Sequence, residues 1–380
     1  MKNRANLGFV TVEKSESVFP IKTRDAPLVY VYTGPNFPEY GVPSLRFSQA
    51  ESGARVICLT ESPSPRSLDE KIEWINIKDF YDPEPFKKFA ETTNLPAKFR
   101  DGFWLHTAQR FFVLRDYMKF SNTNELFHAE LDVLVYSLQA LQKILRESLL
   151  HGVFMPRETL DRIVASLVYT NSQNAMNQLC EAITSGSHLG NEMDILGALD
   201  KHSAPWLHNL ATAEYLYRSY RQEPARGNWD VLSSSYDYVV DGAVIGRWLF
   251  GVDPRNTDFR GTQNLIQEQK NTVPFELPMS QLRFSSLTES GKLRVRVANG
   301  NWHDIVAIHV HSKVHAKLSA RRIRIIADRA NRLRRTWIVL PELRWYQNFC
   351  GRIVKDFRLV LRSKALRDQY FARLKTKIFK

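Results

Sequence analysis

The sequence predicts an α/β fold in which a mostly parallel sheet is flanked by helices and followed by a basic helical extension. Short apolar runs that end in turn residues alternate with longer segments of helical periodicity. Parallel strands joined by crossover helices produce that alternation. A chain of 380 residues with 43% hydrophobic residues is also long enough for one large α/β domain with additions, or for two domains.

Strands are expected where β-branched and aromatic residues form short runs. Pro27–Thr33 (PLVYVYT) ends in Gly34-Pro35, and Ala54–Thr60 (ARVICLT) is also closed by turn residues. Further strands are expected at Glu73–Ile77, within Glu125–Tyr136, at Arg162–Tyr169 and at the start of Ile305–Lys313.

Helices are expected where apolar residues recur at helical spacing. In Gly102–Phe120 they form one broad side that only Arg115 interrupts. Ser137 and Asn191 are predicted N-caps, because their side chains can accept hydrogen bonds from the first helical N–H groups. The other expected helices are Ser44–Ala50, part of Phe80–Pro96, Ser137–Leu150, Asn174–Ile183, a segment ending at Leu199, and Pro205–Tyr220.

The first chemical signal lies in Glu125–Tyr136 (ELFHAELDVLVY), where apolar residues bracket Glu130 and Asp132. Residues spaced two apart share a face in an extended chain, so both carboxylates stand together at the end of a buried strand. Adjacent like charges repel unless a cation lies between them, and hard oxygen ligands suit Mg²⁺ or Mn²⁺. In parallel sheets, ligands bind at the carboxyl ends of the strands. The alternative is a pair of solvated acids at a strand end.

Two later stretches carry further candidates. Tyr236–Asn256 contains Asp241, Gly242 and Gly246 before a helix-like apolar run. Its small residues allow the close backbone approach that a ligand-facing segment needs, although an ordinary buried helix is the alternative.

The second stretch is Ile305–Lys313 (IVAIHVHSK), an apolar strand that ends with His309, His311 and Lys313 on one face. Imidazole can bind a metal ion and lysine can neutralise a phosphate. Structural roles for these side chains are the alternative.

Charge is distributed unevenly along the chain. From Lys313 to Lys380 there are 20 Lys and Arg against 4 Asp and Glu, a net charge of +16. Because the whole chain carries +13, residues 1–312 sum to −3. A nucleic-acid enzyme more often carries basic charge around its cleft as well, so nucleic acid is a disfavoured partner.

Other features concern the compartment. Cys58, Cys180 and Cys350 show no paired or metal-ligand spacing, which fits a reducing compartment. The N-terminus has no apolar core of a signal peptide, and no apolar run approaches the ~20 residues that a spanning helix needs. A soluble protein, or one peripheral to a membrane, is expected.

The segments FHAELD, DGAVIGRWLFGVDPRN and IHVHSK occur in this order in a region of about Pro27 to Lys313. That region resembles a group of bacterial glycosyltransferases of the polysaccharide-biosynthesis type, with the Rossmann-like, nucleotide-sugar-binding type A fold. Two positions depart from the group's pattern: Glu-Leu-Asp stands where the fold commonly has Asp-x-Asp, and Val244 stands where relatives often have alanine.

The resemblance implies a role for each matching residue. Glu130 and Asp132 would hold Mn²⁺ or Mg²⁺ against the diphosphate of a UDP- or GDP-sugar, and His309 or His311 would complete the metal shell. Lys313 would contact the diphosphate.

The resemblance further places the Pro27–Thr33 strand and its Gly34 loop, with Thr33 and Gly34, against the nucleoside. Asp241 would recognise the acceptor or act as a general base.

The predicted organisation is a lead-in at 1–25, a catalytic domain at 26–313 and a basic amphipathic tail at 314–380. In the tail, apolar residues recur at helical spacing among arginines and lysines, which suits an anionic membrane surface. The predicted function is metal-dependent transfer of a sugar to a surface-glycan or lipid-linked acceptor, at the cytoplasmic face of the membrane. The alternatives are a non-catalytic nucleic-acid- or membrane-binding protein and a metal-dependent phosphoesterase.

Overall fold

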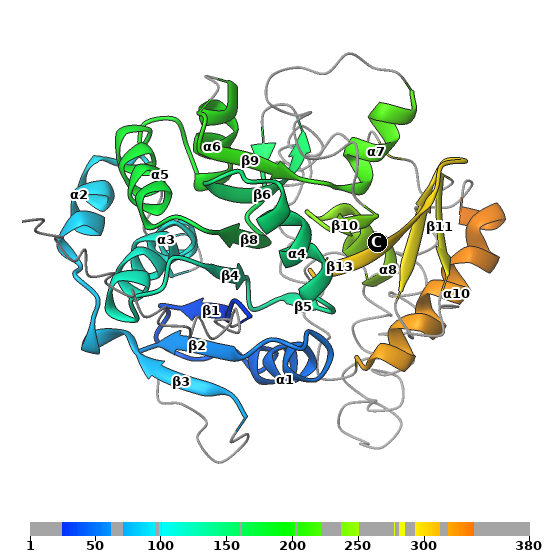
Figure 1. The fold of residues 1–380 in the computed structure, drawn as a ribbon, viewed down its shortest axis with the longest axis horizontal. Helices are drawn as coiled ribbons and strands as arrows, with labels where there is room; N and C mark the ends of the chain where they lie inside the picture. Colours follow the sequence, from blue (N-terminus) through cyan, green and yellow to red (C-terminus); the bar gives the residue numbers. More distant parts are fainter. Residues whose placement is uncertain are drawn as a thin grey trace, which may run out of the picture.

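The structure is a computed structural model. Its strands form two sheets, and helices pack against both of them (Figure 1). It describes residues 25–61, 71–95, 99, 101–159, 162–201, 204–221, 237–250, 277, 281–285, 293–311 and 318–337. Outside these residues lie positions 1–24 of the predicted lead-in, positions 251–256, Lys313, Cys350 and most of the basic tail.

Within the described residues, eight strands form the larger sheet, in the order β3-β2-β1-β4-β8-β6-β7 with β9 beside β6. The pairs β3–β2, β2–β1, β1–β4 and β6–β9 are parallel, whereas β8 is antiparallel to β4 and to β6. Strands β1, β4, β6 and β9 therefore run in the same direction. The bounds are β1 Leu28–Tyr32, β2 Val56–Thr60, β3 Glu73–Asn76, β4 Leu126–Ala129, β6 Val153–Thr159, β7 Arg162–Ile163, β8 Leu167–Thr170 and β9 Leu207–Leu210.

Helices cover both faces of this sheet because its strands alternate apolar side chains between the faces. In β1, Val29 and Val31 join the core under α2, α3, α5 and α6, while Leu28 and Tyr30 join the core under α1 and α4. This arrangement confirms the predicted α/β class with a mostly parallel, helix-flanked sheet. The bounds are α1 Gly41–Glu51, η1 Ile77–Asp79, α2 Glu84–Thr92, α3 Phe103–Phe120, α4 Gln139–Glu147, α5 Gln173–Ser185 and α6 Glu192–Lys201.

A smaller sheet of five described strands lies beside the larger one, in the order β10-β13-β12-β11 with β5 on the other edge of β13 (Figure 1). Strand β13 is antiparallel to β5 and β12 and parallel to β10. Helices α8 and α10 pack against one apolar face of this sheet. The bounds are β5 Val133–Val135, β10 Tyr238–Val240, β11 Leu282–Ser285, β12 Arg294–Val297, β13 Trp302–His309, α7 Ala213–Tyr220, α8 Val244–Phe250 and α10 Ala320–Trp337.

The stretch Glu125–Tyr136 is not one strand. It forms β4 in the larger sheet and β5 in the smaller one, and the chain turns between them. The Val133 N–H donates to the Glu130 carbonyl oxygen at 2.9 Å, which closes this turn. Glu130 and Asp132 therefore lie on a sheet-to-sheet connection, directly after the carboxyl end of β4.

Two other predicted elements are wrong in part. Arg162–Tyr169 contains the separate strands β7 and β8, and the predicted helix over Pro205–Tyr220 begins only at Ala213, because Leu207–Leu210 pairs with β6 as β9.

One of the two predicted N-caps is confirmed. Asn191 accepts hydrogen bonds from the N–H groups of Met193 and Asp194 at 3.0 and 3.3 Å. Ser137 is not an N-cap, because α4 begins at Gln139 after Leu138 and has no side-chain cap.

Two further observations concern the cysteines and the apolar length of the helices. Cys58 and Cys180 are buried free thiols, as predicted. Among the described helices, none has both the length and the apolar composition needed to cross a membrane. The predicted domain boundary at 313 lies within 312–317, outside the described residues, and stays a prediction.

Candidate metal centre

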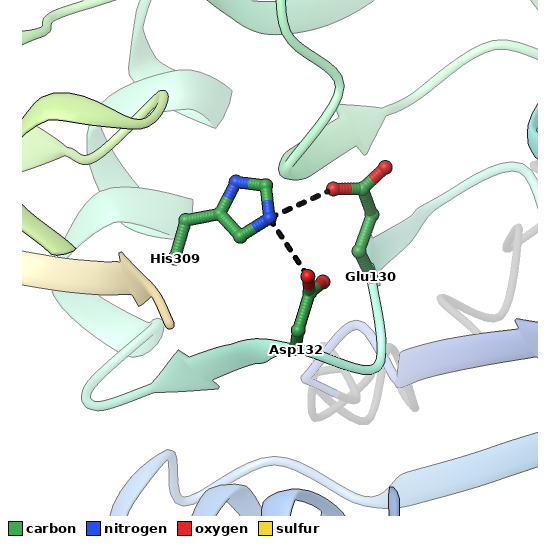
Figure 2. Close-up of side chains that lie close together, drawn as sticks. All are labelled: Glu130, Asp132 and His309. Atoms are coloured by element: carbon green, nitrogen blue, oxygen red, sulfur yellow. Dashed lines mark hydrogen bonds and ion pairs between the residues drawn. The ribbon is translucent and has the colours of Figure 1, made fainter. Parts of the chain in front are cut away.

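Three side chains, two from the connection between the sheets and one from the end of β13, converge on one point (Figure 2). His309, the last residue of β13, places its Nε2 atom 3.0 Å from Asp132 Oδ2 and 3.5 Å from Glu130 Oε2. One ligand atom from each of the three residues lies within 4.8 Å of the other two. Asp132 and His309 are buried and Glu130 is half-buried. Two carboxylates and an imidazole at this spacing can hold a divalent cation.

The topology explains why residues 177 positions apart meet. Strand β5 starts at Val133, directly after the acids, and pairs antiparallel with β13 so that His309 lies opposite Val133. The Val310 N–H then donates to the Asp132 carbonyl oxygen at 2.7 Å. The pairing of β5 with β13 therefore positions the imidazole of His309 next to the two carboxylates.

The hydrogen bond of the second ring nitrogen sets the tautomer of His309. Nδ1 lies 2.8 Å from the Gly242 carbonyl oxygen, which can only accept, so Nδ1 carries a proton. In the neutral ring the lone pair of Nε2 then faces the two carboxylates. Three electron-rich atoms within 4.8 Å of one another repel unless a cation or an added proton lies among them. The local chemistry therefore fits a metal ion.

Asp241 stabilises the backbone around His309 through hydrogen bonds. Its side chain is buried and accepts N–H groups from Ile245 at 2.9 Å, Gly246 at 2.7 Å and His309 at 3.1 Å. Burial raises the pKa of Asp241 to about 6, against the lowering effect of the backbone N–H groups and of His309. The carboxylate thus links the start of α8 to the end of β13.

Gly246 allows α8 to approach β13. A Cβ atom at this position would lie 1.8 Å from the His309 carbonyl oxygen and 3.0 Å from Asp241 Oδ2, so only glycine fits. At Gly242 the nearest side-chain atoms would be 3.8 Å away, an ordinary contact. The predicted close backbone approach in Tyr236–Asn256 is therefore present at Gly246, where it positions a candidate ligand.

Two residues that sequence reasoning missed adjoin the cluster. Arg110 of α3 pairs with Glu130 and lies 3.7 Å from Glu192, and all but 7% of its side chain is buried. Burial raises the pKa of Glu192, while Arg110 and a 2.8 Å hydrogen bond from Thr107 lower it. The only signal in the sequence is an arginine among apolar residues of α3, which does not reveal its partners.

The other predicted site residues lie nearby or outside the described residues. Thr33 and Gly34 follow the carboxyl end of β1, the parallel neighbour of β4, and the Thr33 hydroxyl lies 2.9 Å from His106 Nδ1. The ring of His311 stacks on His309 with centroids 3.9 Å apart, so the two histidines do share a face. The ligand role of His311, the catalytic role of Asp241 and the nucleoside contacts stay predictions.

Comparisons with known proteins give no family assignment. No protein-family model and no curated protein sequence matches the chain.

Three solved structures are similar to parts of the chain at low scores. Mouse xyloside xylosyltransferase 1 shows 10% identity over 50% of this chain and 86% of that one, with a TM-score of 0.35. An active-site mutant of LgtC shows 14% identity over 80% and 96%, with a TM-score of 0.37. The glycosyltransferase GlyE of Streptococcus pneumoniae TIGR4 shows 11% identity, with a TM-score of 0.32, over 52% of this chain and half the length of GlyE. The structures are those of glycosyltransferases, but similarity at this level is too low to assign an activity.

Proposed function

We propose that the protein is a metal-dependent glycosyltransferase that moves a sugar from a nucleotide-sugar donor to a glycan acceptor. The observation that carries the proposal is the convergence of Glu130, Asp132 and His309 Nε2 after the carboxyl end of a parallel strand. Ligands of α/β sheets bind at that edge. The segments FHAELD and IHVHSK, which contain these residues, are also the ones that resemble glycosyltransferases.

The two carboxylates and the imidazole suit a cation that is shared between the protein and the diphosphate of the nucleotide sugar. Mg²⁺ and related ions are commonly held by one or two carboxylates together with substrate phosphates. When bound, the ion would supply stabilisation of the negative charge that develops on the departing diphosphate. Asp132 and Glu130 would provide the anionic ligands, and Asp241 and Gly242 would orient His309.

Roles for three further residues in binding the nucleotide sugar are part of the proposal. Thr33 and Gly34 follow β1, the strand adjacent to β4, and would contact the nucleoside of a UDP- or GDP-sugar. Lys313 lies four residues after His309 and would neutralise the diphosphate.

The proposal is tested by thermal shift with UDP, GDP and other nucleoside diphosphates, each with and without Mn²⁺ or Mg²⁺. One nucleotide is expected to raise the melting temperature only when metal is present. Asp132→Asn should lose this ligand-dependent rise and keep the metal-free melting temperature within a few degrees. Asp79→Asn, which removes an exposed acid of η1, should keep the rise.

Three outcomes contradict the proposal. No nucleoside diphosphate stabilises the wild type with either metal, or Asp132→Asn retains the full response. Metal-dependent hydrolysis of phosphate esters, without sugar transfer, would point instead to a phosphoesterase.

We also propose that the basic C-terminal region attaches the protein to an anionic membrane surface at the cytoplasmic face, where a lipid-linked glycan acceptor is available. In α10, Arg321 and Arg322 are exposed and Ile325 is 43% exposed. Exposed apolar and basic side chains on one helix favour anionic lipid headgroups.

Membrane attachment is tested by flotation with anionic and neutral vesicles. Arg352→Gln combined with Arg358→Gln and Arg362→Gln should reduce flotation with anionic vesicles, while Arg46→Gln should not. Equal flotation of all forms would contradict attachment through the tail.

A further inference from the structure

Arginine side chains and one tryptophan share a face of the smaller sheet, far along β13 from the metal centre. In β12, Arg294 and Arg296 are partly exposed while Val295 and Val297 are buried, so the arginines point away from the apolar face that α8 and α10 cover. The strand pairing places Arg296 opposite both Arg283 of β11 and Trp302 of β13. We call Arg283, Arg294, Arg296 and Trp302 the arginine–tryptophan face.

Two of these arginines are held in place by their neighbours. The Arg296 guanidinium lies over the Trp302 ring, 5.2 Å from its centroid. Arg294 donates to the Trp302 carbonyl oxygen at 3.0 Å and its Nε lies 3.0 Å from Asp304 Oδ1. The face therefore presents guanidinium groups whose positions are already set, which lowers the entropy lost when they bind a ligand.

The charge on this face is not balanced within the described residues. Asp304 neutralises Arg294, but Arg283 and Arg296 lie directly opposite each other, and like charges in that position destabilise a sheet. Arg283 is exposed, and no ion pair of Arg283 or Arg296 occurs among the described residues. An anionic group placed between the two guanidinium groups would remove their repulsion and accept hydrogen bonds from both.

We propose that the arginine–tryptophan face binds an acidic glycan, whose carboxylate or phosphate substituents contact Arg283 and Arg296 next to Trp302. This deepens the proposed function by naming the acceptor class, and rests on that function for the role of the glycan as acceptor. His309 follows Trp302 by seven positions, which corresponds to roughly 23 Å along β13. A glycan of several sugars held at the face could therefore extend toward the metal centre.

The side chains of the face disfavour two other anionic ligands, a membrane surface and single-stranded nucleic acid. Exposed large apolar side chains, which a membrane-inserting surface needs, occur in the described residues at Phe120, Leu149, Leu189, Tyr220 and Ile325, and none belongs to β11, β12 or β13. Single-stranded nucleic acid is usually held by a series of aromatic rings, whereas these three strands present only Trp302 on this face.

The experiment measures binding of full-length protein to polygalacturonate, a carboxylate-bearing polysaccharide, and to neutral dextran by affinity electrophoresis without metal or nucleotide. Arg283→Gln combined with Arg296→Gln should raise the dissociation constant for polygalacturonate about tenfold. The control, Arg46→Gln with Arg55→Gln, removes the same charge from exposed positions and should change it less than twofold. Asp132→Asn should bind as the wild type does, which separates this inference from the proposed metal site.

Trp302→Leu serves as a second variant, because it removes the ring under Arg296 without changing charge, and weaker binding is expected. The inference is overturned if the wild type binds polygalacturonate no better than dextran, or if both double variants lose affinity equally. It is also overturned if the Arg283 and Arg296 substitutions weaken binding only to a (dT)₂₀ oligonucleotide or to anionic vesicles.

Discussion

Gly246→Ala tests whether the approach of α8 to β13 positions the metal ligand. The new Cβ would lie 1.8 Å from the His309 carbonyl oxygen, whereas real Cβ atoms essentially never approach closer than 3.0 Å. The helix and strand must therefore separate by at least 1.2 Å at this point. That movement disturbs the hydrogen bonds from Gly246 and His309 to Asp241, and with them the direction of the imidazole.

Gly246→Ala is expected to lower both the free energy of unfolding and the metal affinity. Overpacking of this kind costs about 1–3 kcal/mol of folding free energy. Disturbing the residues that orient a metal ligand costs about 10–100-fold in metal affinity. The melting temperature and the Mn²⁺ dissociation constant from isothermal titration calorimetry measure the two effects separately.

Gly242→Ala is the matched control, since its Cβ would make only ordinary contacts with Glu158 and Val164 at 3.8 and 3.9 Å. It should bind Mn²⁺ within about twofold of the wild type. The reasoning is refuted if folded Gly246→Ala binds Mn²⁺ as tightly as the wild type, or if the control loses as much affinity.

Three further predictions follow from the same region. His309→Gln should abolish calorimetrically detectable Mn²⁺ binding in a protein that remains folded, because its Nε2 is one of three ligand atoms; unchanged binding would place the ion elsewhere. Arg110→Leu should destabilise the fold by about 3–5 kcal/mol in denaturant titrations, because it leaves a buried acid without its partner, whereas Arg55→Gln, in an exposed pair, should cost less than about 1 kcal/mol. Burial lowers the pKa of His128 from 6.5 to about 3, so the unfolded chain takes up a proton that the folded protein does not. The stability that His128 provides above pH 6.5 is lost as the pH falls, by about 1 kcal/mol at pH 5.5, and His128→Asn should remove that part of the pH dependence in unfolding titrations.

Local patterns in the sequence were sufficient to predict most strands of the larger sheet and most helices that cover it. The apolar runs of β1 and β2 and the periodicity of α3 each determine one element with little help from distant residues. Spacing also predicted that Glu130 would lie near Asp132 and His309 near His311, and both pairs are close. The extended chain assumed in that prediction is absent, because both acids lie in a turn and His311 follows the end of β13.

Other elements depend on strand pairing between distant parts of the chain, which local patterns do not predict. Glu125–Tyr136 reads as one stretch because both halves are apolar and the turn contains neither glycine nor proline, yet β4 and β5 pair in different sheets. Leu207–Leu210 lies in an aromatic segment whose spacing also suits a helix, and only its pairing with β6 makes it a strand. The pairing of Arg110 with Glu130, and the hydrogen bond from the His309 N–H to Asp241, are set by geometry that no local pattern encodes.

The separation of the proposed metal ligands along the chain has a consequence for synthesis. Asp132 precedes His309 by 177 residues, so at about 5–20 residues per second the ribosome adds the imidazole roughly 9–35 s after the carboxylate. A nascent chain in that interval has the two acids but not the third ligand, and cannot hold an ion in the three-residue cluster. Capture of the metal through all three ligands is therefore expected to report that both sheets have assembled.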